Sequence, residues 1–328
     1  MIRFNFPAVY SADLDKNYTR VGSCFFVEDE KYILMADGRC GKAADRAVKR
    51  LSNRGRYKIL FLSHSHYDHR DGISDAIAKC DDVKVLICQD PKTLNKKYSD
   101  EAKRDIEALE RIIKAARDKR IAVVYAEDGG HFQYGELDFI TYRDQPSSAR
   151  NTETYINQGS LCLWFPKDRI LYTGDTGAYC IKKHGLNPIF TCGHHHGNWL
   201  GHSDAEYAHD HGCLYYWDDD YSTGITDFLE TGRGNAKEVG MMILSNHTDT
   251  NIVTFGKTGI IYKNGKQYRY VCSNGGKNTM KRATLTTVFN VFSGKYGSSD
   301  ARVTKLLDLG FNPGSVQGWV NKFAGVVK

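Results

Sequence analysis

Four side chains with metal-binding chemistry lie within six residues of one another, at His64, His66, Asp68 and His69. Imidazole is the commonest metal ligand in proteins, and carboxylate is its usual partner around a divalent ion. In an extended segment His64 and His66 point to the same side, and Asp68 and His69 follow where the chain turns back. This spacing predicts two adjacent metal ions bound by one loop.

The element that must position this loop is the apolar, β-prone run at residues 59–62, directly before it. Residues 42–51 and 98–120 have helical patterns, and the second begins with Ser99 as a predicted N-cap. After the loop, a helix-like segment follows Asp71 and Gly72. Further strands are predicted by short apolar or alternating runs. Their ranges are 22–28, 31–37, 83–88, 121–125, 160–165, 169–175, 188–192, 214–217 and 241–244, with hairpins at 129–142 and 251–271.

The segment HSHYDH matches the HxHxDH signature of the metallo-β-lactamase superfamily, and three other segments agree with that family in order. They are ILMADGR with Asp37, LYTGDTG with Asp175, and CGHHHGN. The chain most resembles the branch that includes the metal-dependent domain of ComEC-type DNA-uptake proteins and the phosphorylcholine esterase of pneumococcal cell walls. The match covers about residues 15 to 270.

This resemblance implies an α+β fold, an αββα sandwich of two mixed sheets with helices outside. It also implies up to two divalent ions, zinc or manganese, the second one held weakly. Asp68 is expected to hold a metal and orient the attacking nucleophile, and His196 to assist the leaving group. Asp37 and Asn157 are expected to orient ligands. The implied metal ligands are His64, His66, Asp68, His69, Asp175 and His195.

The chain departs from the wider family just before the strand at 160–165. Many members have a metal-binding histidine there, whereas the segment RNTETYINQGSLCLWF has none. Asn157 or Asn151 occupies its approximate place, so one metal is expected to have fewer protein ligands. For the remaining ligand, His195 is the first choice and His196 the second among His194, His195 and His196, and the neighbour is expected to meet a substrate phosphate.

The composition is that of a water-soluble globular chain of 328 residues, with 41% apolar and 26% charged residues. No apolar run approaches the ~20 residues of a membrane span, so no membrane partner is expected. Nine cysteines without CxxC spacing indicate reduced thiols. The N-terminal residues have no apolar core or cleavage site of a secretory signal. We therefore expect a cytoplasmic protein, or one released to the cell wall on lysis.

The last part of the chain predicts a second domain. Residues 1–272 form the hydrolase-like domain, 273–282 a linker, and 283–328 a three-helix bundle with helices at 284–292, 300–309 and 313–323. Residues 281–328 contain seven basic and two acidic residues, which accounts for five of the six net positive charges of the chain. The segments GKYGSSDAR and LGFNPGSVQGWVN resemble the cell-wall-binding repeat of phage lysozymes. The implied glycan contacts are Tyr296, Arg302, Gln317 and Asn321.

Three functions are compatible with these observations. The first is a metal-dependent phosphodiesterase that acts on cell-wall-associated polymer and is brought to it by the C-terminal repeat. The second is a nuclease-like hydrolase of the DNA-uptake type, in which the basic tail binds nucleic acid. The third is a wall-binding protein that contains metal but has no turnover. A β-lactamase or thioesterase function fits less well, because the histidine before residue 160 is missing.

Overall fold

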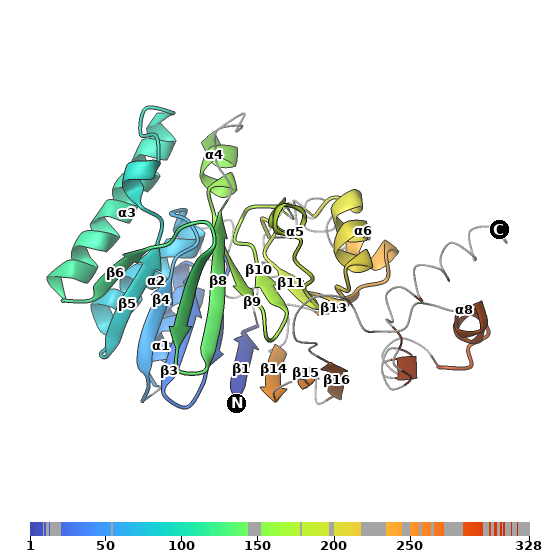
Figure 1. The fold of residues 1–328 in the computed structure, drawn as a ribbon. Helices are drawn as coiled ribbons and strands as arrows, with labels where there is room; N and C mark the ends of the chain where they lie inside the picture. The colour runs from blue at the N-terminus through green and yellow to red at the C-terminus, as the bar shows by residue number, and fades with distance from the viewer. Residues whose placement is uncertain are drawn as a thin grey trace.

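The computed structural model describes residues 1–8, 10, 13, 21–53, 55–143, 152–177, 179–196, 200–217, 234–244, 250–255, 258–263, 266–271 and 285–297, and residues 302, 305, 306, 309, 311, 316 and 320. Two β-sheets lie face to face, with helices on both outer sides (Figure 1). The predicted αββα sandwich is therefore confirmed.

The first sheet has nine strands in the order β16-β15-β14-β1-β2-β3-β4-β5-β6. Its strands from β3 to β6 pair in parallel, and all its other neighbours are antiparallel. Parallel strands suit the almost continuous apolar runs of this half of the chain. The bounds are β1 Ile2–Phe6, β2 Phe25–Glu28, β3 Tyr32–Ala36, β4 Tyr57–Phe61, β5 Val83–Cys88, β6 Ala122–Tyr125, β14 Thr250–Phe255, β15 Thr258–Lys263 and β16 Lys266–Val271.

The second sheet has seven strands in the order β13-β12-β11-β10-β9-β8-β7. Here β7 to β10 are antiparallel, and β10 to β13 are parallel. Both sheets are thus mixed, as expected. The bounds are β7 Gly130–Tyr134, β8 Leu137–Arg143, β9 Leu161–Phe165, β10 Ile170–Tyr172, β11 Phe190–Cys192, β12 Tyr215–Trp217 and β13 Met242–Leu244.

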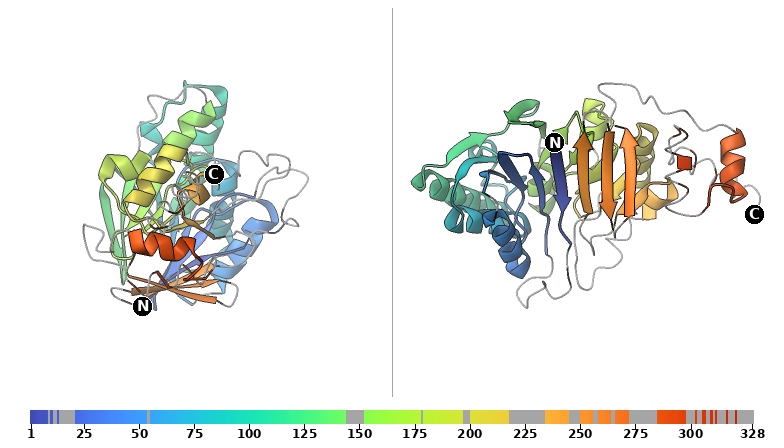
Figure 2. Two further views of the ribbon diagram at one scale, coloured as in Figure 1. Left: turned by 90° about the vertical axis from the view of Figure 1, so that its right-hand side faces the viewer. Right: turned by 90° about the horizontal axis from the view of Figure 1, so that it is seen from below.

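Helices α1, α2 and α3 cover the outer face of the first sheet, and α5 and α6 cover that of the second (Figures 1 and 2). Each buries one apolar stripe, as the amphipathic patterns predict. The predicted cap of α3 is confirmed, since Ser99 accepts a hydrogen bond of 3.0 Å from Ala102 N. The bounds are α1 Gly41–Ser52, α2 Tyr67–Lys79, α3 Asp100–Asp118, α4 Thr152–Gln158, α5 Tyr179–His184 and α6 His202–Asp210.

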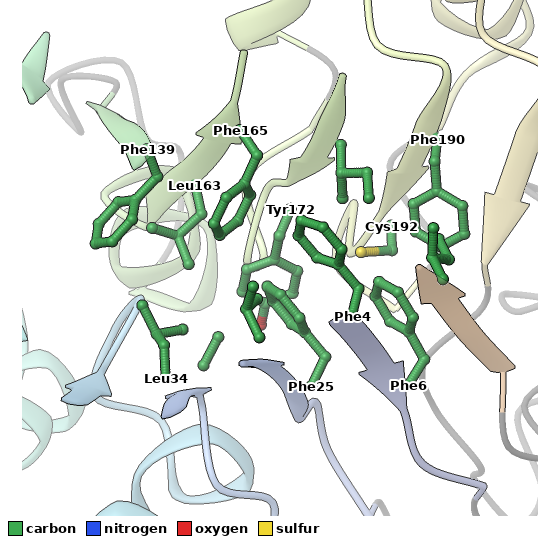
Figure 3. Packing of buried hydrophobic residues seen from close by; sticks show 14 of the residues in the cluster. Phe4, Phe6, Phe25, Leu34, Phe139, Leu163, Phe165, Tyr172, Phe190 and Cys192 are labelled. Carbon is green, nitrogen blue, oxygen red and sulfur yellow. The ribbon is translucent and has the colours of Figure 1, made fainter. Parts of the chain in front are cut away.

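Aromatic and aliphatic side chains from both sheets fill the space between them. Figure 3 shows Phe4, Phe6 and Phe25 of the first sheet facing Phe165, Tyr172 and Phe190 of the second. The rings of Phe4 and Phe165 meet edge to face, with centroids 5.0 Å apart. Burial of this apolar surface holds the two sheets in fixed relative positions. The loops at the strand ends are therefore built on a rigid base.

Two local predictions need correction, and one strand was missed. Helix α2 begins at Tyr67, so Asp68 and His69 lie in its first turn rather than in a loop before it. A carboxylate in the first turn is favoured by the helix dipole, a tendency that outweighs the turn-like residues Asp71 and Gly72. The predicted hairpin at 251–271 is the three strands β14, β15 and β16, and these join the first sheet through β1, a strand that the sequence analysis missed.

In the C-terminal part, the described residues include helix α8, Leu285–Phe292, which matches the first predicted helix of the tail. Val288 and Val291 of α8 share a small core with Leu306, Val316 and Val320, apart from the clusters of the two sheets. The other two predicted helices, the linker at 273–282, and Gln317 and Asn321 lie largely or wholly outside the described residues. Among the described helices, none is long and apolar enough to cross a membrane.

Candidate metal centre

The residues predicted to bind metal meet where strands of both sheets end. His64 and His66 follow β4, and Asp68 and His69 lie on the first turn of α2. Asp175 follows β10 of the second sheet, and His194, His195 and His196 follow β11. Because β10 and β11 are parallel, their carboxyl ends bring Asp175 and the histidine run together. Two groups of potential ligand atoms result.

The first group, which we call position A, consists of His64, His66 and Asp175. His64 Nε2 lies 3.2 Å from His66 Nδ1 and 3.6 Å from Asp175 Oδ2. Nitrogen and oxygen atoms ~2.0 Å from one tetrahedral zinc ion are ~3.3 Å apart. The three donor atoms therefore have the separations of ligands that share one ion.

The second group, position B, consists of Asp68, His69 and His196. His196 Nε2 lies 3.3 Å from Asp68 Oδ2 and 3.4 Å from His69 Nε2. Asp175 approaches this group as well, since its Oδ1 is 3.1 Å from His69 Nε2 and its Oδ2 is 3.3 Å from His196 Nε2. One carboxylate thus stands between positions A and B, which is the arrangement of a bridging ligand.

Hydrogen bonds behind the ligands determine which ring nitrogen faces the centre. Asp37 Oδ2 is 2.7 Å from His69 Nδ1 and accepts hydrogen bonds from Ser63 Oγ at 2.6 Å and from the Tyr172 hydroxyl. Ser63 Oγ is also 3.0 Å from His64 Nδ1. Since Nδ1 of both rings donates to these oxygens, both Nε2 atoms keep a lone pair for a metal. Asp37 thus has the orienting position expected from the sequence.

His66 is oriented from a helix that the sequence analysis did not connect with the site. Asp105 of α3 has its Oδ2 3.6 Å from His66 Nε2, and its Oδ1 accepts a hydrogen bond of 2.8 Å from Arg70. Asp105 therefore lies on the Nε2 side of the His66 ring, and Nδ1 faces His64. Asp105 has the spacing of an ordinary exposed helix residue, so no sequence signal could have identified it. Only the packing of α3 near α2 places it here.

Charge and burial set the protonation of the two groups differently. Burial lowers the pKa of His64 well below its ordinary value, and it also lowers the pKa of His66. Burial opposes protonation of His69 too, but Asp175, Asp37 and Asp68 outweigh it and raise its pKa well above the ordinary value. Burial would raise the pKa of Asp175, whereas His196, His69 and His64 hold it well below its usual range.

These residues fit divalent metal ions. His64 Nε2 and His66 Nδ1 face each other across 3.2 Å while the other nitrogen of each ring is directed at an oxygen atom. With protons on those outer nitrogens, the two facing nitrogens can both offer lone pairs to one cation. Imidazole nitrogens with carboxylate oxygens are the donor set of zinc, manganese or iron rather than of calcium.

The histidine run has an unusual backbone. His194, His195 and His196 have φ of 55°, 51° and 55°, the left-handed region that non-glycine residues rarely adopt. His194 anchors the turn, with its backbone N 2.6 Å from Thr173 Oγ1 and its Nε2 2.7 Å from Thr191 Oγ1. Such strain persists only where the surroundings enforce it. The left-handed turn directs His195 and His196 toward Asp175.

The distances favour His196 as the metal ligand and His195 as its neighbour, whereas the sequence analysis had His195 as the first choice for the ligand. His196 Nε2 has ligand-like separations from Asp68 and Asp175. His195 Nε2 is farther out, 3.9 Å from Asp175 Oδ2, and Asn157 Nδ2 lies 3.1 Å from it. Asn157 belongs to the end of α4 and is fully buried, so it reaches the centre as expected. Asn151 lies outside the described residues.

A short segment before β2 closes one side of position B. Ser23 Oγ is 3.4 Å from His196 Nδ1, and Gly22 packs on the backbone of Asp68. A Cβ atom on Gly22 would lie 1.8 Å from Asp68 O, and its φ is 82°, so only glycine fits there. The sequence analysis missed this contact because nothing in the local pattern relates residues 22 and 68.

No protein-family model matches this chain, and no curated protein matches its sequence. Solved structures do resemble it. The metallo-β-lactamase fold protein YhfI from Bacillus subtilis is 13% identical with a TM-score of 0.50, and the alignment covers 76% of this chain and 99% of that one. Unliganded yeast PDE1 is 11% identical with a TM-score of 0.43, over 74% and 97% of the two chains.

Identities at this level are informative about the fold alone. The DIM-1 metallo-β-lactamase, exposed to ceftazidime, is 13% identical with a TM-score of 0.34, over 72% of this chain and 92% of that one. The resemblance to YhfI agrees with the two mixed sheets and the outer helices found here. The likeness to YhfI and this arrangement of sheets and helices show that the chain has the metallo-β-lactamase fold.

Proposed function

We propose that this protein is a metal-dependent hydrolase of phosphodiesters. The observation that carries the proposal is Asp175, whose carboxylate lies within 3.1 Å to 3.6 Å of donor atoms in both positions. His64, His66 and Asp175 would hold one ion, and Asp68, His69 and His196 with Asp175 the other. Bound divalent ions supply activation of water and neutralisation of charge on a phosphoryl oxygen.

The charge balance supports an anionic ester as substrate. Two divalent ions bring four positive charges, and the donor atoms include only two carboxylates, those of Asp68 and Asp175. Asp37 adds a third negative charge behind His69. The loaded centre would keep a net positive charge in a buried setting, where charge interactions are strong. A phosphodiester is therefore attracted, whereas a neutral amide or thioester gains less.

Residues of the chain would position the reacting groups. Asp68 has one carboxylate oxygen 3.3 Å from His196 Nε2, and its own backbone is fixed by Gly22. His69 and His64 are tied through Asp37 and Ser63 to the ends of β3 and β4. This rigidity lets the centre bind a reacting ester without rearrangement, which lowers the activation barrier.

For the polymer that carries the ester we propose a cell-wall polymer, bound by residues 283–328. Support comes from the resemblance of the tail to wall-binding repeats and from the separate small core around Val288, Val291 and Leu306. Within this core Tyr296 packs against the apolar cluster, and its hydroxyl accepts a hydrogen bond of 3.0 Å from Asn290. Tyr296 therefore also stabilises the tail. Arg302, whose Nε donates a hydrogen bond of 3.3 Å to Gly297 O, is the other glycan candidate among the described residues.

The activity is tested with bis-(p-nitrophenyl) phosphate and protein loaded with zinc or manganese. We expect His66→Ala and Asp68→Ala to abolish hydrolysis, because each removes a donor from one position. His131→Ala is the matched control, since His131 lies on β7 beside Asp138 with an exposed side chain. An unchanged rate in both site variants would place the activity elsewhere.

The partner is tested by sedimentation of the full chain with insoluble peptidoglycan and with duplex DNA at ~50 and ~200 mM salt. Purely electrostatic binding of the basic tail falls steeply over this range. We expect retention on peptidoglycan at the higher salt, reduced by Arg302→Ala. Retention on DNA alone, lost with salt, would replace the wall polymer with nucleic acid as the partner.

A further inference from the structure

The two metal positions are unequally supplied with donor atoms. Position B has Asp68, His69, His196 and the shared Asp175, whereas position A has His64, His66 and the shared Asp175. A tetrahedral ion takes four ligands. Position A is therefore one protein donor short of position B among the described residues. A buried polar atom that lacks a partner, on a residue whose contacts lead to Asp175, would be a candidate for the missing donor.

Asn157 supplies such an atom. Its side chain is fully buried, and Asn157 Oδ1 makes no hydrogen bond among the described residues. A buried amide oxygen without a partner destabilises a protein appreciably, so in native proteins such an atom meets a protein donor, a water or a cation. The other end of the amide is held, because Asn157 Nδ2 is 3.1 Å from His195 Nε2. His195 Nε2 is itself 3.9 Å from Asp175 Oδ2, and the same carboxylate oxygen is 3.6 Å from His64 Nε2.

We propose that Asn157 Oδ1 is the fourth protein donor of position A, and that His195 is a positioning residue which holds the amide by accepting a hydrogen bond from Asn157 Nδ2. The inference extends the proposed function, since it names a ligand of the same centre. An amide oxygen is neutral and harder than an imidazole nitrogen, so it favours manganese over zinc. Both positions then have two nitrogen and two oxygen donors, but position A has one carboxylate and a neutral amide where position B has two carboxylates. Position A therefore carries less negative charge and binds its ion more weakly.

The orientation of the amide decides between two chemistries. With Nδ2 toward His195, the oxygen is left for a cation; with the amide turned over, Nδ2 would be left to donate to an anionic oxygen of the substrate. Oxygen and nitrogen of an amide are assigned from their hydrogen bonds. The structure has the first orientation, with Nδ2 3.1 Å from His195 Nε2 and the oxygen without a hydrogen bond among the described residues, and this orientation requires that His195 Nε2 accept.

The test measures metal binding itself. Metal-free full-length protein is titrated with Mn²⁺ and with Co²⁺, and bound metal is counted by equilibrium dialysis and by the visible absorption of Co²⁺. We expect two ions in the wild type. Asn157→Ala should bind the weaker ion at least ~10-fold less tightly and keep the tighter one. A loss of ~10-fold is the effect expected when a residue that supports a metal site is removed. Asn157→Asp, which keeps the oxygen and adds charge, should bind the weaker ion more tightly than the wild type.

Position is tested by combining variants. His64→Ala should remove the ion at A. The double variant His64→Ala with Asn157→Ala should show no further loss of metal. The double variant His64→Ala with His196→Ala should retain no tightly bound ion. His195→Ala should weaken the same ion as Asn157→Ala, by a smaller factor. Asn53→Ala, an exposed residue at the end of α1, is the matched control. Circular dichroism establishes that each variant is folded.

Two results would overturn the assignment. One is a folded Asn157→Ala protein with unchanged binding of both ions; the other is Asn157→Asp with two ions bound as before but weaker binding of inorganic phosphate, which is the signature of an amide that donates to the substrate. The proposed function fails separately. If the ions follow these expectations and saturating metal gives no hydrolysis of bis-(p-nitrophenyl) phosphate, the ligand assignment stands and the phosphodiesterase does not.

Discussion

Positions A and B lie side by side and share Asp175, yet the protein supports them differently. The ligand His69 of position B is fully buried, and its Nδ1 is 2.7 Å from Asp37. The ligand His66 of position A is 15% exposed, and its supporting carboxylate, Asp105, is 3.6 Å away. A short, buried hydrogen bond such as that of His69 orients a ligand ring more firmly than the longer, partly exposed contact of His66 with Asp105. We therefore expect B to bind metal more tightly than A.

The largest effect is expected from removing Asp175, the ligand that positions A and B share. Asp175→Ala takes a donor from both positions, so we predict that neither ion is retained on dialysis. The rate should fall by more than the ~10²–10³-fold that loss of a single stabilising donor costs. Elemental analysis and the phosphodiester assay measure the two quantities. If Asp175→Ala still held both ions, the bridging arrangement would be refuted.

The next prediction concerns Asp37 and Asp105, the carboxylates that contact the ligand histidines of positions B and A. Asp37→Asn should weaken metal at B by ~10- to 100-fold, because the partner of His69 loses its charge. Asp105→Asn should weaken metal at A, near the lower end of the same range, since the contact with His66 is longer. Competition with a chromophoric chelator gives both affinities. Equal effects of the two substitutions on one ion would contradict the assignment of the supports.

In the metal-free protein, the histidines of positions A and B should affect stability at opposite ends of the pH range. His64 and His66 of position A have lowered pKa values, so their contribution is present above the ordinary histidine pKa and is lost as pH falls through it. His69 of position B has a raised pKa, so its contribution is present below the ordinary value and is lost as pH rises. Each proton changes stability by at most ~1.4 kcal/mol per pH unit.

The melting temperature in the presence of a chelator should therefore be highest near the ordinary pKa of histidine and fall on both sides. His66→Gln should flatten the acid side, and His69→Gln the alkaline side. Differential scanning fluorimetry across pH 5 to 9 measures this. A profile that changes on the same side in both variants would count against the opposite pKa shifts of His66 and His69.

The smallest expected effect concerns the segment that covers position B. Ser23 Oγ is 3.4 Å from His196 Nδ1, which is a long contact. Ser23→Ala should lower the affinity of B only ~2- to 3-fold, because a long hydrogen bond contributes at the low end of its usual range. Isothermal titration of the tighter ion detects it. A loss as large as that of Asp37→Asn would mean that Ser23 has a greater part in holding His196.

Much of the first sheet and its helices could be predicted from the sequence. Buried parallel strands have continuous apolar runs, and α1 and α3 have regular amphipathic spacing, so local composition was sufficient. Strand β1 and helices α4 to α6 were missed because they are short and depend on neighbours for their stability. The start of α2 was placed late because Asp71 and Gly72 resemble a turn, whereas tertiary packing of Gly72 against Gly38 keeps the helix intact.

The sequence by itself determined which residues can bind metal, because His64, His66, Asp68 and His69 are adjacent in the chain and Asp175 and the histidine run stand at strand ends. It could not divide them between two positions. That division depends on distances between residues over 100 positions apart, such as the 3.4 Å between His69 and His196. Likewise, tertiary packing alone brings three further groups to the centre: Asp105 on α3, Ser23 in the segment before β2, and the amide of Asn157 on α4. Local sequence encodes the chemistry of a side chain, and only the tertiary fold decides which atoms face the same ion.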